Sequence, residues 1–242
     1  ERQRIYDNHL LLTKSLDSKQ GLKDTETAIP ILWGESSSGF GNDPKKNTET
    51  LKEITTEAKR LDASFLIGGD RPSSPGEFEN YGIFIDERGE ISGEYLKQHP
   101  VPFGEYIPFR KYLDWIPPLS LVPRDMVRGT QQQVFMTNKN EIKISPVISF
   151  EGSFDRYIRR SVVQGAEVVV ILTNQASYGE SGMSDQFILM SRANAISNNR
   201  DIAHAAITGK SAFISGIDGD IYSSTGLFTD AVLTDVIKTS NK

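Results

Sequence analysis

The chain contains no cysteine. This absence excludes disulfide bridges, metal sites built from thiolates and a thiol nucleophile. It leaves the redox compartment open, because proteins of every compartment can lack cysteine. Histidine is also scarce, with three residues at positions 9, 99 and 204 whose spacing matches no metal-ligand pattern. The sequence therefore predicts no metal site.

Long apolar runs and an excess of positive charge are missing as well. No segment approaches the roughly 18 apolar residues that a membrane-spanning helix requires, and no signal-peptide pattern is present. The chain opens on Glu1 rather than Met, so we expect it to be part of a longer protein. The formal net charge of -5 provides no basic surface for a nucleic acid, and we expect no nucleic-acid partner.

What the chain does contain is typical of a globular protein with a sizeable core. Of its 242 residues, 37% are hydrophobic and 24% are charged. Strand-like and helix-like segments alternate, which indicates a layered α/β fold. The expected strands are residues 28–33, 64–67, 80–86, 90–95, 142–150, 167–172, 202–207, 212–217 and 220–223. Three helices are expected: one that begins at Asp43-Pro44, one over residues 155–164 and one over residues 183–199.

Glycine and proline residues indicate where the regular elements end. Gly68-Gly69 is expected to end the strand 64–67, and residues 70–80 are expected to form a polar loop. Residues 113–123 contain three prolines, which exclude a regular helix or a central strand, yet most of the others are apolar. Two interpretations remain open for this segment: a loop folded back onto the core, or an exposed apolar lip that contacts lipid or an acyl chain.

Three short motifs carry the chemical information. Glu35 directly follows an apolar strand in W-G-E, residues 95–106 read Y-L-K-Q-H-P-V-P-F-G-E-Y, and residues 148–151 read I-S-F-E. Together they resemble the catalytic frame of the nitrilase superfamily, and most closely that of the bacterial apolipoprotein N-acyltransferases. Further segments resemble the same family, namely residues 8–13, 173–182, 186–192 and 208–212. The resemblance covers nearly the whole chain.

The resemblance implies a fold, a reaction and a location. The fold would be a nitrilase-type four-layer α-β-β-α sandwich, formed by residues 1–242 as one domain. The reaction would transfer an acyl chain from a phospholipid donor to the N-terminal amine of a diacylglyceryl lipoprotein acceptor. The domain would lie at the membrane surface on the extracytoplasmic side of the bacterial cytoplasmic membrane, within a longer membrane protein. No metal or organic cofactor is implied.

The same resemblance assigns roles to five residues. Position 149 would be the nucleophile that forms an acyl-enzyme, and Glu35 the carboxylate that accepts and returns its proton. Lys97 would stabilise the oxyanion, and Glu105 would be a second carboxylate near that lysine. Glu151 matches the glutamate that follows the family's nucleophile by two positions.

Position 149 departs from the family, because Ser149 stands where the family has cysteine. A hydroxyl ionises far less readily than a thiol, and no motif places an imidazole beside Ser149, so native serine catalysis is the least favoured interpretation. Two others remain: a working enzyme with a Cys→Ser substitution, or a natural non-catalytic relative that binds a partner protein or a lipid. Gly34, Asn194 and Ser197, which replace the family's Pro, Arg and Glu, favour the second. A soluble amidase is a third possibility, and the P-F-G-E-Y motif argues against it.

Overall fold

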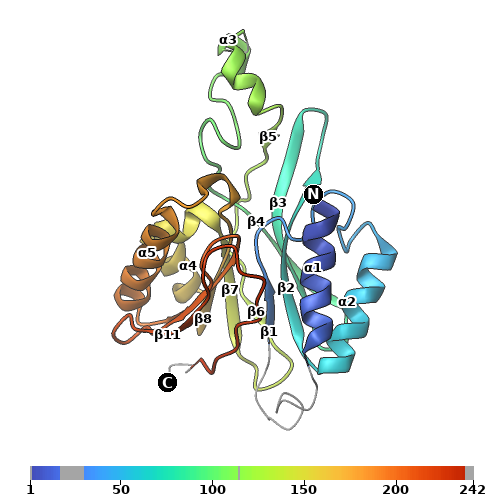
Figure 1. The fold of residues 1–242 in the computed structure, drawn as a ribbon, viewed down its shortest axis with the longest axis vertical. Coiled ribbons are helices and arrows are strands. Elements are labelled where there is room, and N and C mark those ends of the chain that lie inside the picture. The colour runs from blue at the N-terminus through green and yellow to red at the C-terminus, as the bar shows by residue number, and fades with distance from the viewer. Residues whose placement is uncertain (1, 17–29, 114, 238–242) are drawn as a thin grey trace.

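The structure is a computed structural model that describes residues 2–16, 30–113 and 115–237. Two β-sheets lie face to face between two pairs of helices, as Figure 1 shows. The first sheet has the order β1 (Pro30–Trp33), β2 (Ser64–Pro72), β3 (Glu77–Ile85) and β4 (Ile91–Leu96), with β5 (Asp125–Met126) paired to β3. The second has the order β11 (Ile221–Ser224), β10 (Ala212–Ile214), β9 (Asp201–Ile207), β8 (Val168–Asn174), β7 (Lys143–Ile148) and β6 (Phe135–Met136). This arrangement confirms the predicted α-β-β-α sandwich.

The layers follow from the two-residue period of the strands, whose side chains alternate between opposite faces. In β2, Phe65 and Ile67 pack toward the outer helices α1 (Arg2–Ser15) and α2 (Thr48–Leu61), whereas Leu66 faces the second sheet. In β8, Val170 faces the first sheet, whereas Ile171 packs toward α4 (Asp155–Val163) and α5 (Met183–Asn198). The core is therefore built in three apolar layers, one between the sheets and one under each helix pair.

The start of α2 differs from the prediction. The helix begins at Thr48, not at Asp43, and Asn47 is its N-cap, with a side-chain oxygen that accepts from the backbone N–H groups of Glu49 and Thr50. Asp43 instead accepts from Lys45 N at 2.9 Å within a preceding turn. Both residues have a suitable side chain, and the chain path decides which of them meets free N–H groups.

The expected strand end at Gly68-Gly69 is wrong, and so is the polar loop at 70–80. Strand β2 continues to Pro72 and pairs antiparallel with β3, which leaves only a short turn before Glu77. The glycines are needed for a different reason: a Cβ on Gly68 would lie 2.5 Å from the carbonyl oxygen of Gly34. These two positions allow the segment after β1 to pass closely over β2.

Most of the elements that follow match the prediction, but several boundaries differ. The predicted strand 80–86 begins at Glu77, the predicted strand 212–217 ends at Ile214, and the short strands β5 and β6 were not predicted. The predicted strand 142–150 ends at Ile148, and a 3₁₀ turn over Ser149–Ser153 separates it from α4. Strands β7, β8 and β9 run parallel, as expected for the apolar run at the sheet centre. Their carboxyl ends therefore meet at one edge, where the short 3₁₀ turn Ala176–Tyr178 follows β8. Part of the expected strand 28–33 lies outside the described residues, and helix α1 was not predicted.

Residues 109–113 and 115–124, here called the projecting arm, extend away from the sandwich at the top of Figure 1. The arm contains the short helix α3 (Arg110–Leu113) and a 3₁₀ turn at Pro117–Leu121. Trp115 is 79% exposed and Leu121 is 84% exposed. The interpretation as a loop folded back onto the core is therefore wrong, and the exposed apolar lip is the arrangement found.

Helix lengths bear on membrane insertion. Within the described ranges, none of the helices combines the length and the apolar character that crossing a bilayer would take.

Candidate active site

Three of the five predicted site residues meet in a buried ion cluster. The Lys97 ammonium donates to Glu35 Oε1 at 2.9 Å and to Glu105 Oε1 at 2.6 Å. Lys97 is 1% exposed, and Glu35 is buried as well. Such a burial of charge is stable only because the lysine and the carboxylates compensate each other.

Each member of the cluster is held by backbone from a different element. Glu35 follows β1, and its Oε2 accepts from the N–H of Asn174 at the end of β8, at 2.9 Å. Lys97 follows β4, and its own N–H donates to Asn80 O at 2.9 Å. Glu105 folds back over the tight turn at 101–105, where its Oε2 accepts from Val101 N at 2.8 Å. The cluster therefore ties both sheets together at their shared edge.

The charges of the cluster determine its protonation. Burial alone would lower the pKa of Lys97, but the adjacent charges of Glu35 and Glu105 outweigh burial and raise it. Lys97 is therefore a fixed cation at every physiological pH. Burial raises the pKa of Glu105, although the Lys97 charge acts in the opposite direction. A fixed cation beside a carboxylate suits the stabilisation of an oxyanion.

Glu151 is a positioning residue rather than a member of the ion cluster. Its Oε1 accepts from the N–H groups of Gln98 and His99, and its Oε2 accepts from Ile148 N at 2.8 Å and from the Tyr95 hydroxyl at 2.7 Å. Burial raises its pKa, and these hydrogen bonds oppose the rise. This carboxylate joins the residue before Ser149 to the segment directly after Lys97.

Ser149 lies at the same sheet edge in an unusual backbone conformation. Its φ of 54° falls in the left-handed region, which a non-glycine residue seldom adopts. Ile148 pairs in register with Leu172 of β8, and Asn174, two residues farther on, is the residue that binds Glu35. Ser149 therefore emerges beside the ion cluster, at the sharp junction between β7 and the 3₁₀ turn that leads to α4.

Among the described residues, no base is hydrogen-bonded to the Ser149 hydroxyl. Within residues 2–16, 30–113 and 115–237, no side chain or backbone group forms a hydrogen bond with it. Each histidine has a ring nitrogen in contact with another group: His9 Nδ1 with Ile5 O, His99 Nδ1 with Tyr157 and Arg156, and both nitrogens of His204 with Ser191 and Gln175. None of the three imidazoles forms a hydrogen bond with Ser149, although the His99 ring lies 5.6 Å from that of Phe150, the next residue along the chain.

Sequence reasoning missed two polar residues of the site. Asn80 donates to Glu35 Oε1 at 2.7 Å. Asp70 pairs in register with Asn80 and is buried, which raises its pKa to about 6; a hydrogen bond from Ser36 and the charges of Arg2 and Lys97 oppose the rise. Asp70 follows the Gly68-Gly69 pair, and the expectation of a loop there hid its place in the site.

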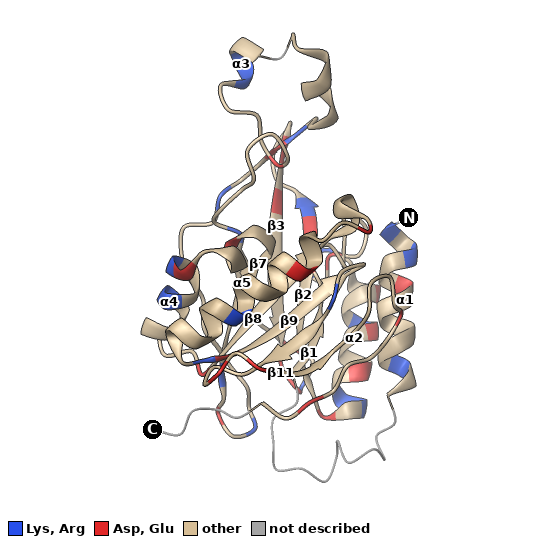
Figure 2. Cartoon of the chain, turned by 60° about the vertical axis from the view of Figure 1, so that its left-hand side comes forward, with Lys and Arg blue, Asp and Glu red and all other residues tan. Residues whose placement is uncertain are grey.

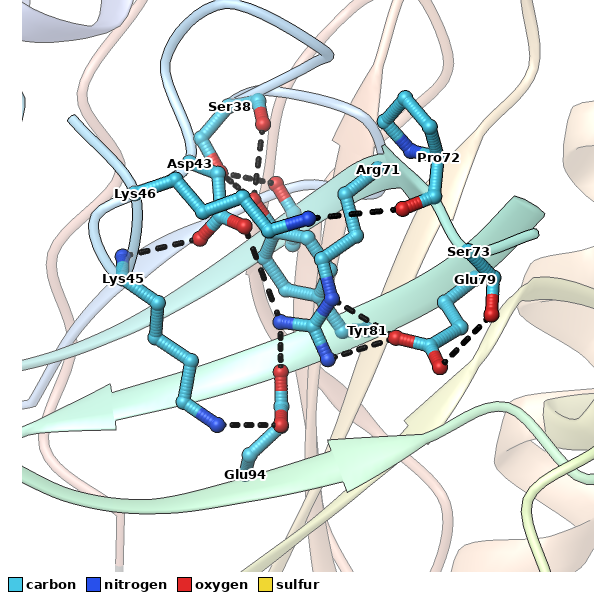
Figure 3. A network of polar contacts seen from close by, with 11 residues as sticks. Ser38, Asp43, Lys45, Lys46, Arg71, Pro72, Ser73, Glu79, Tyr81 and Glu94 are labelled. Atoms are coloured by element: carbon cyan, nitrogen blue, oxygen red, sulfur yellow. Dashed lines mark hydrogen bonds and ion pairs between the residues drawn. The ribbon is translucent and has the colours of Figure 1, made fainter.

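A second ion network supports the segment that carries Glu35. Arg71 binds Glu79 at 2.7 Å and also contacts Glu94, whose carboxylate binds Lys45 at 2.6 Å (Figure 3). The Arg71 guanidinium lies 4.9 Å from the ring centre of Tyr81, whose hydroxyl donates to Ser38 O at 3.0 Å. The network thus fixes the turn that follows Glu35 onto β2 and β3.

The family departures in α5 have structural replacements. Asn194 is buried and donates to Gly152 O at 2.8 Å, which holds the 3₁₀ turn after Ser149. Ser197 is exposed and binds Asp155 at 2.9 Å. The two positions therefore differ in burial, because Asn194 is buried and Ser197 is exposed.

A metal site in the described part of the chain would need a cluster of side chains that could bind the ion. No group of three His, Asp or Glu side chains there is arranged to hold a metal ion.

Comparisons with known proteins place this arrangement in a family. The family model described as "Carbon-nitrogen hydrolase" matches residues 25–240. The chain is 31% identical to an apolipoprotein N-acyltransferase of Mycolicibacterium smegmatis over 98% of its length. It is 30% identical to those of Geobacter metallireducens and Haemophilus ducreyi, over 86% and 95% of its length. It spans only 40%, 40% and 44% of these relatives.

Solved structures share the fold. A carbon-nitrogen hydrolase from Helicobacter pylori superposes with a TM-score of 0.66 at 13% identity, over 93% of this chain and 81% of that one. A cysteine-to-serine mutant of a nitrilase-superfamily amidase from Nesterenkonia superposes with a TM-score of 0.63 at 17% identity, over 93% of this chain and 80% of that one. The family match, the shared fold and the Glu–Lys–Glu cluster agree: the chain belongs to the carbon-nitrogen hydrolase family.

Proposed function

We propose that this chain is the acyl-transfer module of an apolipoprotein N-acyltransferase at the extracytoplasmic surface of the bacterial membrane. The single observation that carries the proposal is the buried Glu35–Lys97–Glu105 cluster beside position 149. Sequence similarity over nearly the whole chain to curated proteins of that name supports it.

The first half-reaction would acylate position 149. The Oγ atom attacks the ester carbonyl of a phospholipid while Glu35 accepts its proton, and the developing oxyanion is stabilised by the Lys97 ammonium. The bond between the acyl carbon and the glycerol oxygen then breaks. That oxygen takes the proton back from Glu35, and a lysophospholipid leaves.

The second half-reaction would regenerate the protein. The N-terminal amine of a diacylglyceryl lipoprotein attacks the acyl carbon, and Lys97 again stabilises the oxyanion. The bond to Oγ breaks, and Glu35 transfers a proton from the amine to Oγ. Tyr95 and Glu151 take no proton in these reaction steps, since their contacts serve to position the segments on which Lys97 and residue 149 lie.

The serine sets the rate in this proposal. A thiol provides a few per cent of thiolate near neutral pH, whereas a serine hydroxyl provides almost no alkoxide and here has no hydrogen-bonded base among the described residues. We therefore expect very slow acylation with Ser149 and a large gain with Ser149→Cys.

The test compares Ser149→Cys with the serine form in phospholipid vesicles that contain a lipopeptide with a free N-terminal amine. Mass spectrometry follows the acyl adduct on the protein and the acylated lipopeptide. Ser149→Cys should react at least 100-fold faster, and Glu35→Gln in that background should abolish the gain. Ser153→Cys is the matched control, because it places a thiol in the same 3₁₀ turn and should gain nothing.

A second candidate is a non-catalytic module that binds a partner protein or a lipid through the same site. The isolated Ser149 hydroxyl favours it. If Ser149→Cys is inert while a cysteine-bearing relative works in the same vesicles, the acyl-transfer proposal fails and this candidate takes its place.

A further inference from the structure

An aromatic wall beside the site fixes the orientation of His99, two residues after Lys97. The imidazole lies against three rings, with centroid separations of 5.0 Å to Phe154, 5.6 Å to Phe150 and 5.8 Å to Tyr157. Its backbone N–H donates to Glu151 at 2.9 Å. The residue remains partly exposed to solvent.

The contacts of His99 determine its tautomer. Arg156 Nη2 and the Tyr157 hydroxyl both lie 3.0 Å from His99 Nδ1. A guanidinium can only donate, so Nδ1 is the acceptor and the neutral ring carries its proton on Nε2. Among the described residues no group accepts from Nε2, which leaves this N–H as an unmatched donor.

Arg156 is held in place without a carboxylate partner. Its guanidinium lies 4.7 Å from the Phe154 ring centre and 4.9 Å from that of Tyr157. No ion pair joins it to any described carboxylate, whereas Arg159 on the same helix is paired with Asp155. Figure 2 shows the basic positions of α4 in blue. The charge of Arg156 is therefore available to a ligand, and stacking on the two rings has already reduced the conformational freedom of its side chain.

Arg128 supplies a second unpaired charge. Its guanidinium lies 5.3 Å from the ring centre of Tyr106, and the next residue, Gly129, donates its N–H to Lys97 O at 2.8 Å. No described carboxylate forms an ion pair with it. The Gly129–Lys97 bond places Arg128 on the segment next to the one that carries His99, two residues after Lys97. Burial and the charges of Arg156, Arg128 and Lys97 lower the pKa of His99.

We propose that His99, Arg156 and Arg128 form a subsite for the phosphate ester of a ligand, directly beside the acyl-transfer site. The three side chains present only donors, and two of them carry a full positive charge. A phosphate offers several acceptor oxygens to such a set, and a guanidinium binds it in bidentate geometry. The assignment to a phospholipid headgroup rests on the proposed function, whereas free phosphate would satisfy the same chemistry.

The experiment uses ring-¹⁵N-labelled histidine in the Ser149 chain. NMR follows the His99 nitrogens during titration with short-chain phosphatidylglycerol, with inorganic phosphate, and with short-chain diacylglycerol, which has the same tails but no phosphate. Phosphatidylglycerol should shift the His99 signals and raise the pKa of His99, because a bound anion offsets the two guanidiniums. Buried His9 and His204 serve as internal references and should not move.

Variants assign the binding to the arginines. Arg156→Gln and Arg128→Gln should each weaken the Kd for phosphatidylglycerol about tenfold or more, as loss of a charge-assisted hydrogen bond predicts. Arg159→Gln is the matched control on the same helix and should leave the Kd unchanged, because that arginine is already paired with Asp155.

The outcomes separate the subsite from the proposed function. Equal shifts with diacylglycerol, no shift with either phosphate ligand, or equal weakening by Arg159→Gln would each overturn the subsite. Equally tight binding of inorganic phosphate supports the subsite and assigns it to free phosphate. Because binding requires no chemistry, binding without acyl transfer contradicts only the proposed function, and acyl transfer without binding contradicts only the subsite.

Discussion

At the scale of single residues, Lys97 neutralises two carboxylates, of which Glu35 is buried and Glu105 is partly buried. Lys97→Met leaves Glu35 and Glu105 without their cation, and we expect a loss of about 3–5 kcal/mol in the free energy of unfolding. Lys45→Met, which removes a half-exposed partner of Glu94, should cost about 1 kcal/mol or less. Urea unfolding of both variants measures the difference.

The pH dependence of Lys97→Met provides an independent check. Burial already raises the pKa of Glu105, and removal of the lysine charge raises it further. A carboxyl whose pKa is higher in the folded state than in the unfolded state stabilises the fold at low pH and loses that contribution as pH rises. The variant should therefore recover stability relative to the parent from pH 7 to pH 5. An unchanged difference would show that Lys97 acts through packing alone.

Asp70 should give the parent protein a pH-dependent stability of its own. Burial raises its pKa from 3.8 to about 6 in the folded state, so its contribution is fully present below pH 3.8 and is lost as pH rises through 6. Asp70→Asn removes this titration. As the pH rises from 4 to 7, the free energy of unfolding of the variant should therefore increase by about 2 kcal/mol relative to that of the parent. Unfolding curves at several pH values measure it.

A control variant isolates the effect of Asp70. Asp62→Asn changes an exposed carboxylate at the end of α2, in a left-handed conformation that asparagine tolerates. Its stability relative to the parent should stay constant within about 0.5 kcal/mol over the same pH range. A pH profile for Asp70→Asn that follows this control would refute a buried, proton-binding Asp70.

At the scale of elements, the close crossing of the β1–α2 segment over β2 decides the position of Glu35. A Cβ on Gly68 would lie 2.5 Å from Gly34 O and 2.8 Å from the Cα of Glu35, and both of these are backbone atoms. Gly68→Ala should therefore cost about 1–3 kcal/mol and displace Glu35. Thermal unfolding gives the stability, and loss of acylation in the Ser149→Cys background reports the displacement.

Gly41→Ala is the matched control for that substitution. A Cβ at position 41 meets no atom within 4 Å, so the variant should be as stable as the parent or slightly more stable. If both alanine variants are equally stable and equally reactive, close approach at Gly68 does not position Glu35.

At the scale of the whole molecule, the projecting arm presents apolar side chains that the sandwich does not need. Its helix α3 also carries the basic residues Arg110 and Lys111, and Figure 2 shows blue on this helix. Trp115→Ser combined with Leu121→Ser should leave the free energy of unfolding within about 0.5 kcal/mol of the parent. Binding to vesicles that contain anionic lipid should fall at least tenfold, because burial of these side chains in the interface is lost.

An exposed apolar residue elsewhere tests whether the arm is special. Val163 at the end of α4 is 81% exposed, comparable to Trp115 and Leu121. Val163→Ser should not change vesicle binding in a flotation assay. Equal losses from both changes would mean that binding depends on general surface hydrophobicity and not on the arm.

The sequence by itself determined the layered architecture, the family and the residues of the ion cluster. The apolar period is a local property, and it sufficed to identify strand β8 and helix α5. The resemblance of short motifs to a known family identified the trio Glu35, Lys97 and Glu105, which the structure brings together.

Only the tertiary structure decided the details that depend on contacts between distant segments. The sequence around Gly68 is typical of a strand end, and only the structure shows that the segment after β1 passes closely over it. The sequence around Asp70 is typical of a loop, and only the structure shows that this residue lies in β2, paired with β3. The 113–123 segment fitted a buried loop and an exposed lip equally well, because its composition contains no information on whether any surface lies opposite it. Such contacts form between residues far apart in the chain, and no local pattern encodes them.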